Sequence, residues 1–325
     1  MEKLNMLPNS NLAASITKSA SQQTYYTVRL LVDRDRLADA YRAYAYFRWV
    51  DDSLDSLAGS QAEHLAFIAR QRSLLEACYR GDFSSPVNDN EQMLFDLVRQ
   101  DREPGSGLQF YLRNMMAVMD FDARRRGRLI SQTELDRYSH LLASAVTENM
   151  HYFIGHCCPS PHDETRYLAV TAAHITHMLR DTYDDVQAGY YNIPRELLDA
   201  HHVQPQDLQS QDLKSPVYRL WARSRVQLAR AYFRLGRDYL SRVKNLRCRL
   251  AGYAYTARFE WLLDAIERDG YHLRSAYPER KSFRAGLAMS GQVLSSLFNL
   301  PWLGDSPQPI SPQSVAPRPA VLRKL

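Results

Sequence analysis

Apolar residues recur every three or four positions along most of the chain, which is the spacing of amphipathic α-helices. The longest such stretch runs from about Ser21 to Leu57, and we expect a break near Asp33, whose side chain is suited to cap a second helix. The fifty residues between Pro8 and Gly59 contain neither glycine nor proline, which a strand-and-turn protein needs at frequent reversals. The pattern therefore predicts an all-α chain.

Further helices are expected to follow without a long linker. Their predicted ranges are 61–80, 90–100, 107–126, 132–154, 163–188, 216–243, 246–269 and 280–299. We expect one helical domain over residues 21–303. A loose lead-in over residues 1–20 precedes it, and a proline-rich, disordered tail over residues 304–325 follows it.

Charge and cysteine usage limit the classes of function. The 41 basic and 36 acidic residues leave a formal charge of +5, which is too small to indicate nucleic acid and compatible with an anionic substrate or a membrane surface. The four cysteines form no C-x-x-C pair, which argues against a zinc site or a disulfide framework. No apolar run is long enough to span a bilayer, and the first residues lack the apolar core of a signal peptide. We expect a cytoplasmic protein and leave peripheral membrane contact open.

Two acidic motifs carry the candidate chemistry. The first, Asp51-Asp52-Ser53-Leu54-Asp55, lies near the end of a predicted helix rich in aromatic residues. Asp51 and Asp55 are one helical turn apart and share a face, which continues back through Arg48 and Tyr44. Carboxylates one turn apart repel each other, and a cation between them relieves that repulsion. A solvated acidic helix end is the alternative interpretation.

The second motif is His174-x-x-His177-x-x-Arg180-Asp181-Thr182-Tyr183-Asp184-Asp185. On a helix, both imidazoles and the carboxylates of Asp181 and Asp185 fall within about 80° of one another. Mg²⁺ takes a few carboxylates and leaves its other positions to water and phosphate oxygens, and arginine binds phosphate through two parallel hydrogen bonds. Two such faces, opposed across a helical bundle, would hold a diphosphate through metal ions.

The two motifs together resemble those of the squalene/phytoene synthase family. The stretch YRAYAYFRWVDDSLD is similar to the family's first Asp-rich motif, and HITHMLRDTYDDVQAGYYNIP is similar to the second motif and the flap behind it. The similarity extends through DRYSHLLASAVTE and the helix ending LLDAIERDGY, over about residues 20–295. The resemblance implies an all-α isoprenoid-synthase bundle around a deep, apolar central cavity.

Carried over by position, the resemblance implies roles for individual residues. Tyr44 is implied to line the reacting centre with the acids of both motifs. The implied metal ligands are Asp51, Asp55, His177, Asp181 and Asp185, with Mg²⁺ as the ion and Mn²⁺ as a second candidate. The implied substrate-binding residues are Gln22, Gln23, Thr24, Arg48, His174, Arg180 and Phe259.

The implied reaction joins two prenyl diphosphates, farnesyl or geranylgeranyl, head to head with release of diphosphate. The product would be of the presqualene, squalene, dehydrosqualene or phytoene type. The use of NADPH and the oligomeric state stay open, and no nucleic-acid partner is expected. Two alternative functions also stay open: a class I terpene cyclase acting on one prenyl diphosphate, and a non-catalytic family member that serves in assembly or as a scaffold.

The chain departs from the family pattern at positions that bear on the site. His174 and His177 stand where the family usually has Gln and Asn. Because imidazole is a poor Mg²⁺ ligand, these histidines could select another metal, contact phosphate, or be hydrogen-bonded inside the bundle. A Ser-(Lys/Arg)-(Ser/Thr)-Phe segment of the family appears here as Gln22-Gln23-Thr24-Tyr25, which loses a positive charge. Tyr190 occupies a flap position where Arg is common, and Phe259 stands where Tyr is usual.

Two further features have competing interpretations. Ser144 and Thr147 replace glycines of the family's pocket wall. They either make the cavity narrower and more polar or donate back to the carbonyl four residues earlier and only pack. The run Arg124-Arg125-Arg126-Gly127-Arg128 is interpreted as a solvated helix end, with binding of phosphate or anionic lipid as the alternative.

Overall fold

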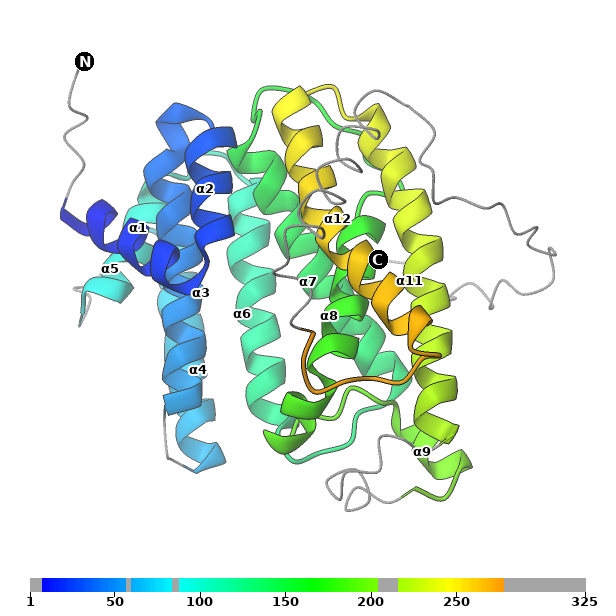
Figure 1. Cartoon of the computed structure of the whole chain (residues 1–325). Coiled ribbons are helices and arrows are strands. Elements are labelled where there is room, and N and C mark those ends of the chain that lie inside the picture. Colours follow the sequence, from blue (N-terminus) through cyan, green and yellow to red (C-terminus); the bar gives the residue numbers. More distant parts are fainter. Residues whose placement is uncertain (1–7, 57–59, 84–87, 204–215, 278–325) are drawn as a thin grey trace.

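The computed structural model describes residues 8–56, 60–83, 88–203 and 216–277, and their regular structure is entirely helical (Figure 1). The all-α prediction is confirmed. The predicted helix at 280–299 and the tail at 304–325 lie outside the described residues. The elements are α1 (Pro8–Ala20), α2 (Gln22–Leu31), the 3₁₀ turn η1 (Arg34–Arg36), α3 (Leu37–Ser56), α4 (Gln61–Tyr79), α5 (Asp89–Gln100), α6 (Gly107–Arg125), α7 (Gln132–Phe153), α8 (Leu168–Gln187), α9 (Arg195–Ala200), α11 (Pro216–Arg242) and α12 (Leu246–Arg268).

Side-chain caps fix the starts of several helices. At α7 the Ser131 hydroxyl accepts a hydrogen bond from the Glu134 backbone at 3.2 Å, and the Glu134 carboxylate accepts one from the Ser131 backbone at 2.8 Å. This reciprocal pair satisfies two N–H groups that the helix itself leaves unpaired. Asn88 and Asn245 cap α5 and α12 through their side-chain oxygens. The polar breaks between apolar stretches therefore serve as helix starts.

The N-terminal segment differs from the expected loose lead-in, because residues 8–20 form α1, which packs against α3. Ala13 and Thr17 lie one turn apart and are completely buried. The Thr17 hydroxyl donates to the Ala13 carbonyl at 2.8 Å, which satisfies it inside the interface. Small and polar residues on the packed face explain why the hydrophobic pattern does not reveal this helix.

The predicted break near Asp33 is confirmed, because α2 ends at Leu31 and α3 begins at Leu37. The expected capping role is wrong. The Asp33 carboxylate makes no cap hydrogen bond and instead accepts from the backbone N–H groups of Gly155 and His156, at 3.0 and 3.1 Å. It thus ties the α2–α3 junction to the end of α7.

The helices pack side by side in a bundle (Figure 1). Its interior contains two contiguous hydrophobic clusters. One cluster lies around α3, α5 and α6, and the other around α8, α11 and α12. The backbones of α8 and α11 approach closely, because a Cβ added at Gly236 would lie 2.7 Å from Ala169. This close packing fixes the position of α8, which carries the second acidic motif.

Hydrogen bonds bring together the ends of the helices that carry the acidic residues. The Gly127 backbone N–H donates to the Gly189 carbonyl at 2.8 Å, which joins the end of α6 to the end of α8. The Gln61 side chain at the start of α4 donates to the Arg124 carbonyl at 3.3 Å. Because α4 follows α3 after a short connection, the last turns of α3, α6 and α8 lie at one end of the bundle. Within the described ranges, no helix has the length and apolar character that crossing a membrane requires.

Candidate active site

The first acidic motif occupies the last turns of α3. Arg48 lies 3.5 Å from Asp51 and also binds Asp52, with Nε 3.0 Å from Oδ2. Burial, with the nearby charge of Asp55, raises the pKa of Asp51 to about 6. Tyr44 lies one turn before Arg48, and burial raises its pKa as well. The structure therefore places Tyr44, Arg48, Asp51 and Asp55 together, and Arg48 neutralises the acids only in part.

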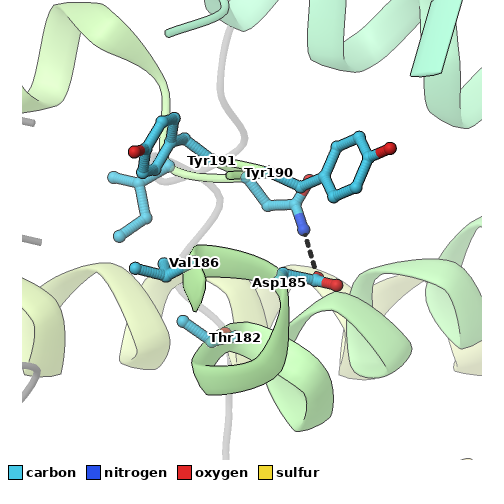
Figure 2. A pocket seen from close by; sticks show the side chains of 7 residues that line it. Thr182, Asp185, Val186, Tyr190 and Tyr191 are labelled. Carbon is cyan, nitrogen blue, oxygen red and sulfur yellow. Dashed lines mark hydrogen bonds between the residues drawn. The ribbon is translucent and has the colours of Figure 1, made fainter. Parts of the chain in front are cut away.

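The second motif occupies the last turns of α8. Asp181 accepts two hydrogen bonds from Arg180, at 2.5 and 2.7 Å, and its Oδ2 lies 3.1 Å from Nε2 of His177. Asp185 accepts a hydrogen bond from the Asn192 amide at 2.7 Å (Figure 2). Burial, with the charge of Asp181, raises the pKa of Asp185 to about 7. Like the first motif, this one keeps carboxylates close together in a poorly solvated place.

A further acid, Asp122 on α6, joins the two motifs and is not singled out by the sequence pattern. It is an electrostatic neighbour of Asp51, Asp55 and Asp185. Its carboxylate accepts hydrogen bonds from Arg125 at 2.6 Å and from the Tyr138 hydroxyl at 2.9 Å. Burial raises the pKa of Asp122 despite these donors. The two motifs and Asp122 thus form one acidic site contributed by three helices.

Arg125 lies at the centre of this site, so the interpretation of the arginine run as solvated surface is wrong for this residue. It is 5% exposed and donates to the side-chain oxygen of Asn192 at 2.7 Å. Its guanidinium lies 4.8 Å from the ring centre of Tyr138 and 5.0 Å from that of Tyr190. A continuous chain of contacts therefore runs from Asp185 on α8 to Tyr138 on α7.

The segment after α8 covers the second motif. Gly189, at φ +85°, turns the chain back, and Tyr190 and Tyr191 then lie over the last turn of α8 (Figure 2). Together they enclose a small pocket. Its lining residues are Thr182, Asp185, Val186, Tyr190, Tyr191, Asn192 and Ile193. This segment corresponds to the flap expected from the sequence, and Tyr190 covers Arg125 where an arginine was expected.

The start of α2 lies next to α12. Ser21 caps α2 through a hydrogen bond from the Thr24 backbone at 3.2 Å, and Gln22 and Gln23 form the first turn. The Gln23 side-chain carbonyl accepts a hydrogen bond of 2.7 Å from Arg258. The sequence does not point to Arg258, which is 235 positions away from Gln23. The Arg258 guanidinium therefore brings a positive charge to the first turn of α2, which has no basic residue of its own.

Phe259 and the two histidines connect α12 with α8. The Phe259 ring lies 4.4 Å below the Arg258 guanidinium and meets the His177 ring edge to face at 6.1 Å. His174, one turn before His177, is 6% exposed, and neither ring nitrogen has a hydrogen-bond partner among the residues that the structure describes. Of the interpretations left open for His174, the one with a hydrogen bond inside the bundle is therefore not supported within the described part of the chain.

Comparison with known proteins identifies the family. A family model described as squalene/phytoene synthase matches residues 17–285, which is most of the chain. The chain belongs to the squalene/phytoene synthase family. Members of this family are transferases of isoprenoid and carotenoid biosynthesis, and the chain is assigned to this enzyme class.

Individual relatives are distant. The chain is similar to the presqualene diphosphate synthase of Zymomonas mobilis, with 29% identity over 194 residues. The match covers 59% of this chain and 62% of that protein, which is less than two thirds of that protein's length. It is also similar to the phytoene synthase of Thermus thermophilus, with 26% identity over 284 residues, or 86% and 91% of the two chains. A solved squalene synthase from Alicyclobacillus acidocaldarius shares the fold, with a TM-score of 0.63, 21% identity and coverage of 82% of this chain and 95% of that one.

The acids of this squalene/phytoene synthase family member suit a hard divalent cation. Among the residues that the structure describes, no three His, Cys, Asp or Glu side chains lie close enough to hold an ion by themselves. Each motif instead presents two carboxylates one turn apart, and burial, together with the neighbouring charges of Asp55 and Asp181, raises the pKa values of Asp51 and Asp185. Mg²⁺ binds through one or two carboxylates and completes its shell with water and substrate phosphates. The donor set therefore fits Mg²⁺.

The two pocket-wall hydroxyls of this family member behave differently. Ser144 donates to the carbonyl of His140 at 2.8 Å, four residues earlier, and accepts from Asn114 at 3.0 Å. The Ser144 hydroxyl is therefore hydrogen-bonded within the protein, as the interpretation that this residue only packs expects. Thr147 is 4% exposed, and in the described parts of the chain its hydroxyl finds no hydrogen-bond partner. The back-bonding interpretation thus holds for Ser144 and fails for Thr147.

Proposed function

We propose that the protein condenses two prenyl diphosphates head to head in a Mg²⁺-dependent reaction and releases diphosphate. The observation that carries this proposal is the single acidic site built from α3, α6 and α8, with Arg48 and Arg180 beside its carboxylates. Family membership supports the reaction class. The names of the two curated relatives, presqualene diphosphate synthase and phytoene synthase, support prenyl diphosphates as substrates.

Four carboxylates would hold the metal: Asp51, Asp55, Asp181 and Asp185. Mg²⁺ bound there would stabilise the negative charge that develops on the diphosphate when its C–O bond breaks. Arg48 and Arg180 would donate to phosphate oxygens, and charge-assisted hydrogen bonds of this kind are about twice as strong as neutral ones. We include Arg258 as a third phosphate-binding cation, because it stands over the first turn of α2 beside Gln23.

The buried network behind the acids positions them. Asn192 donates to Asp185 and accepts from Arg125, and Arg125 in turn holds Asp122. A network whose members are all hydrogen-bonded keeps its geometry when charge develops nearby, which is the condition for preorganised electrostatic stabilisation. The rings of Tyr138 and Tyr190 both pack against the Arg125 guanidinium and limit the access of water to this part of the site.

Product analysis tests the proposal. The purified protein would be incubated with farnesyl diphosphate and with geranylgeranyl diphosphate in separate reactions, with Mg²⁺ or Mn²⁺ and with or without NADPH. We expect products with twice the carbon number of the substrate, formed only with a divalent ion and detected by mass spectrometry of the organic extract. Products with the carbon number of the substrate would indicate a terpene cyclase instead. Absence of turnover in every reaction would favour the scaffold role.

A further inference from the structure

Three large apolar side chains are exposed where α2 ends and α12 begins. They are Leu30, which is 70% exposed, Leu246, which is 58% exposed, and Tyr26, which is 49% exposed. Tyr26 and Leu30 lie one turn apart on α2, on the side of the helix opposite the buried Val28. These two side chains therefore project away from the bundle.

A contact between the two helices brings Leu30 and Leu246 to the same part of the surface. Arg247, which follows Leu246 in the sequence, donates a hydrogen bond of 2.9 Å to the carbonyl of Leu31. The Arg247 guanidinium also forms an ion pair with Asp33, just after the end of α2. We call the surface that contains Tyr26, Leu30 and Leu246 the α2–α12 surface.

The α2–α12 surface is remote from the acidic site. Near the start of α7, the Tyr138 hydroxyl binds Asp122 of that site. Just after the end of α7, the backbone N–H groups of Gly155 and His156 bind Asp33. Because a helix of 22 residues is about 33 Å long, most of the length of α7 separates the two places. Charges in water are screened over about 8–10 Å, so the carboxylates of the acidic site do not repel an anion at the α2–α12 surface.

Basic residues flank the apolar side chains of the α2–α12 surface in the sequence. Exposed basic residues in these segments are Arg29, Arg34, Lys244 and Arg247. The two acids of the α2–α3 junction lie close to arginines, since Asp33 pairs with Arg247 and Asp35 is 3.9 Å from Arg36. The surface therefore combines protruding apolar groups with an excess of positive charge.

We propose that the α2–α12 surface docks on a membrane that contains anionic lipids. Leucine side chains gain free energy when they enter the boundary of the acyl chains, and a tyrosine ring suits the level of the headgroups. Lysine and arginine next to them attract the lipid phosphates while their heads stay in water. Membrane contact would also bring the enzyme to the lipid into which a long apolar product partitions, a consequence that rests on the proposed function.

Cosedimentation of the full-length protein with lipid vesicles tests the proposal. One set of vesicles contains equal parts of phosphatidylcholine and phosphatidylglycerol, and the other contains phosphatidylcholine alone. The apolar variants are Leu30→Gln and Leu246→Gln, with Leu220→Gln as the matched control, because Leu220 on α11 is 57% exposed. The charge variant is Lys244→Gln, with the exposed Arg219→Gln on α11 as its control. Circular dichroism checks that each variant is folded.

We expect wild-type protein to bind the anionic vesicles and to bind phosphatidylcholine vesicles at least tenfold more weakly. Leu30→Gln and Leu246→Gln should each lower the partition coefficient about tenfold, because a leucine no longer leaves water. Lys244→Gln should lower it about fivefold at low salt and less at high salt. Leu220→Gln and Arg219→Gln should bind as wild type does.

Wild-type protein that does not sediment with anionic vesicles would overturn the proposal. So would a loss of binding in Leu220→Gln as large as that in Leu30→Gln. Sedimentation velocity without lipid tests a second copy of the chain as the occupant. A wild-type dimer that Leu30→Gln dissociates, without vesicle binding, would assign the surface to self-association and overturn membrane docking.

These results are independent of the proposed reaction. Vesicle binding is measured without substrate, so a failure of membrane docking leaves the head-to-head condensation intact. A protein that binds the vesicles but forms no product with twice the carbon number of the substrate would overturn the proposed function alone.

Discussion

Arg258 on α12 donates a hydrogen bond of 2.7 Å to the side-chain carbonyl of Gln23 in the first turn of α2. The contact brings a positive charge to a segment that has none of its own between Ser21 and Tyr25. A second relationship is similar: Tyr190 in the flap lies over the guanidinium of Arg125, which belongs to α6. At both places an uncharged residue is paired with an arginine from another helix.

Arg258→Gln should weaken substrate binding. Loss of a charge-assisted hydrogen bond costs about 1.5–3 kcal/mol, which corresponds to a rise in KM of about tenfold to a hundredfold. The measurement is KM for farnesyl diphosphate at saturating Mg²⁺. Arg234→Gln, at an exposed position of α11, is the control and should leave KM unchanged. An equal KM in both variants would rule out a phosphate-binding role for Arg258.

Arg125→Met should destabilise the fold. It removes the guanidinium from a buried ion pair and leaves Asp122 without its strongest partner. Breaking one side of such a pair costs about 3–5 kcal/mol in the free energy of unfolding. Chemical denaturation of Arg125→Met, Asp122→Asn and the double variant measures the coupling between the two residues. If the two single effects simply add, the ion pair does not contribute as the structure indicates.

The pH dependence of stability should reveal the crowded carboxylates. The folded-state pKa values of Asp51 and Asp185 are raised to about 6 and about 7, so the folded protein binds more protons than the unfolded chain below these values. Stability of the metal-free protein should therefore rise as the pH is lowered from about 8 to about 6.5. His151 and His174 act oppositely below pH 6.5, because burial lowers their folded-state pKa values to about 4 and about 3.

Melting temperatures measured across this pH range check the prediction. Asp185→Asn should show a flatter rise than wild type, whereas Asp184→Asn, at the exposed neighbouring position, should follow wild type. Added Mg²⁺ should raise the melting temperature more at pH 8 than at pH 6.5, because the ligands must be deprotonated to bind the ion. A wild-type melting temperature that falls as the pH is lowered from 8 to 6.5 would contradict the crowding of these acids.

Ser144→Gly should not change specificity. The Ser144 hydroxyl is already hydrogen-bonded, because it donates to the His140 carbonyl and accepts from the half-buried Asn114 amide, and its removal takes away only these contacts. We expect a loss of stability of about 1 kcal/mol from glycine inside a helix and an unchanged ratio of turnover with farnesyl and geranylgeranyl diphosphate. Thr147→Val, which removes a buried hydroxyl without a partner, should instead be neutral or stabilising. A changed substrate ratio in Ser144→Gly would show that this residue limits the cavity.

Local patterns predicted most of the helices and both acidic motifs. The spacing of Asp51 and Asp55, and of Asp181 and Asp185, is set by helical geometry, and neighbours four positions apart are visible in any sequence. Helix α1 was missed because its buried positions include Ala13 and Thr17, which carry little hydrophobic signal. Hydrophobic periodicity detects a helix only when one of its faces is strongly apolar. It does not detect a helix that packs through small residues.

Contacts between distant segments could not be predicted in the same way. Asp122 and Arg125 belong to a stretch with the sequence pattern of a charged helix end. The packing of α6 against α7 and the contacts with Asn192 and Tyr190 bury Arg125 and leave Asp122 half-buried. Arg258 reaches Gln23 across 235 positions. Side chains that are far apart in the sequence and meet only in the folded protein have no characteristic spacing from which their contact could be predicted.

The most direct test of head-to-head transfer is the amount of product with twice the carbon number of farnesyl diphosphate, measured with Mg²⁺ for wild type, Asp51→Asn and Asp181→Asn. Each substitution removes one of the carboxylates proposed to hold the metal and keeps the side-chain size. We expect each to reduce this product by about 100- to 1,000-fold or more while the circular dichroism spectrum is unchanged. Wild-type product levels in both folded variants would contradict a metal-dependent reaction at this acidic site.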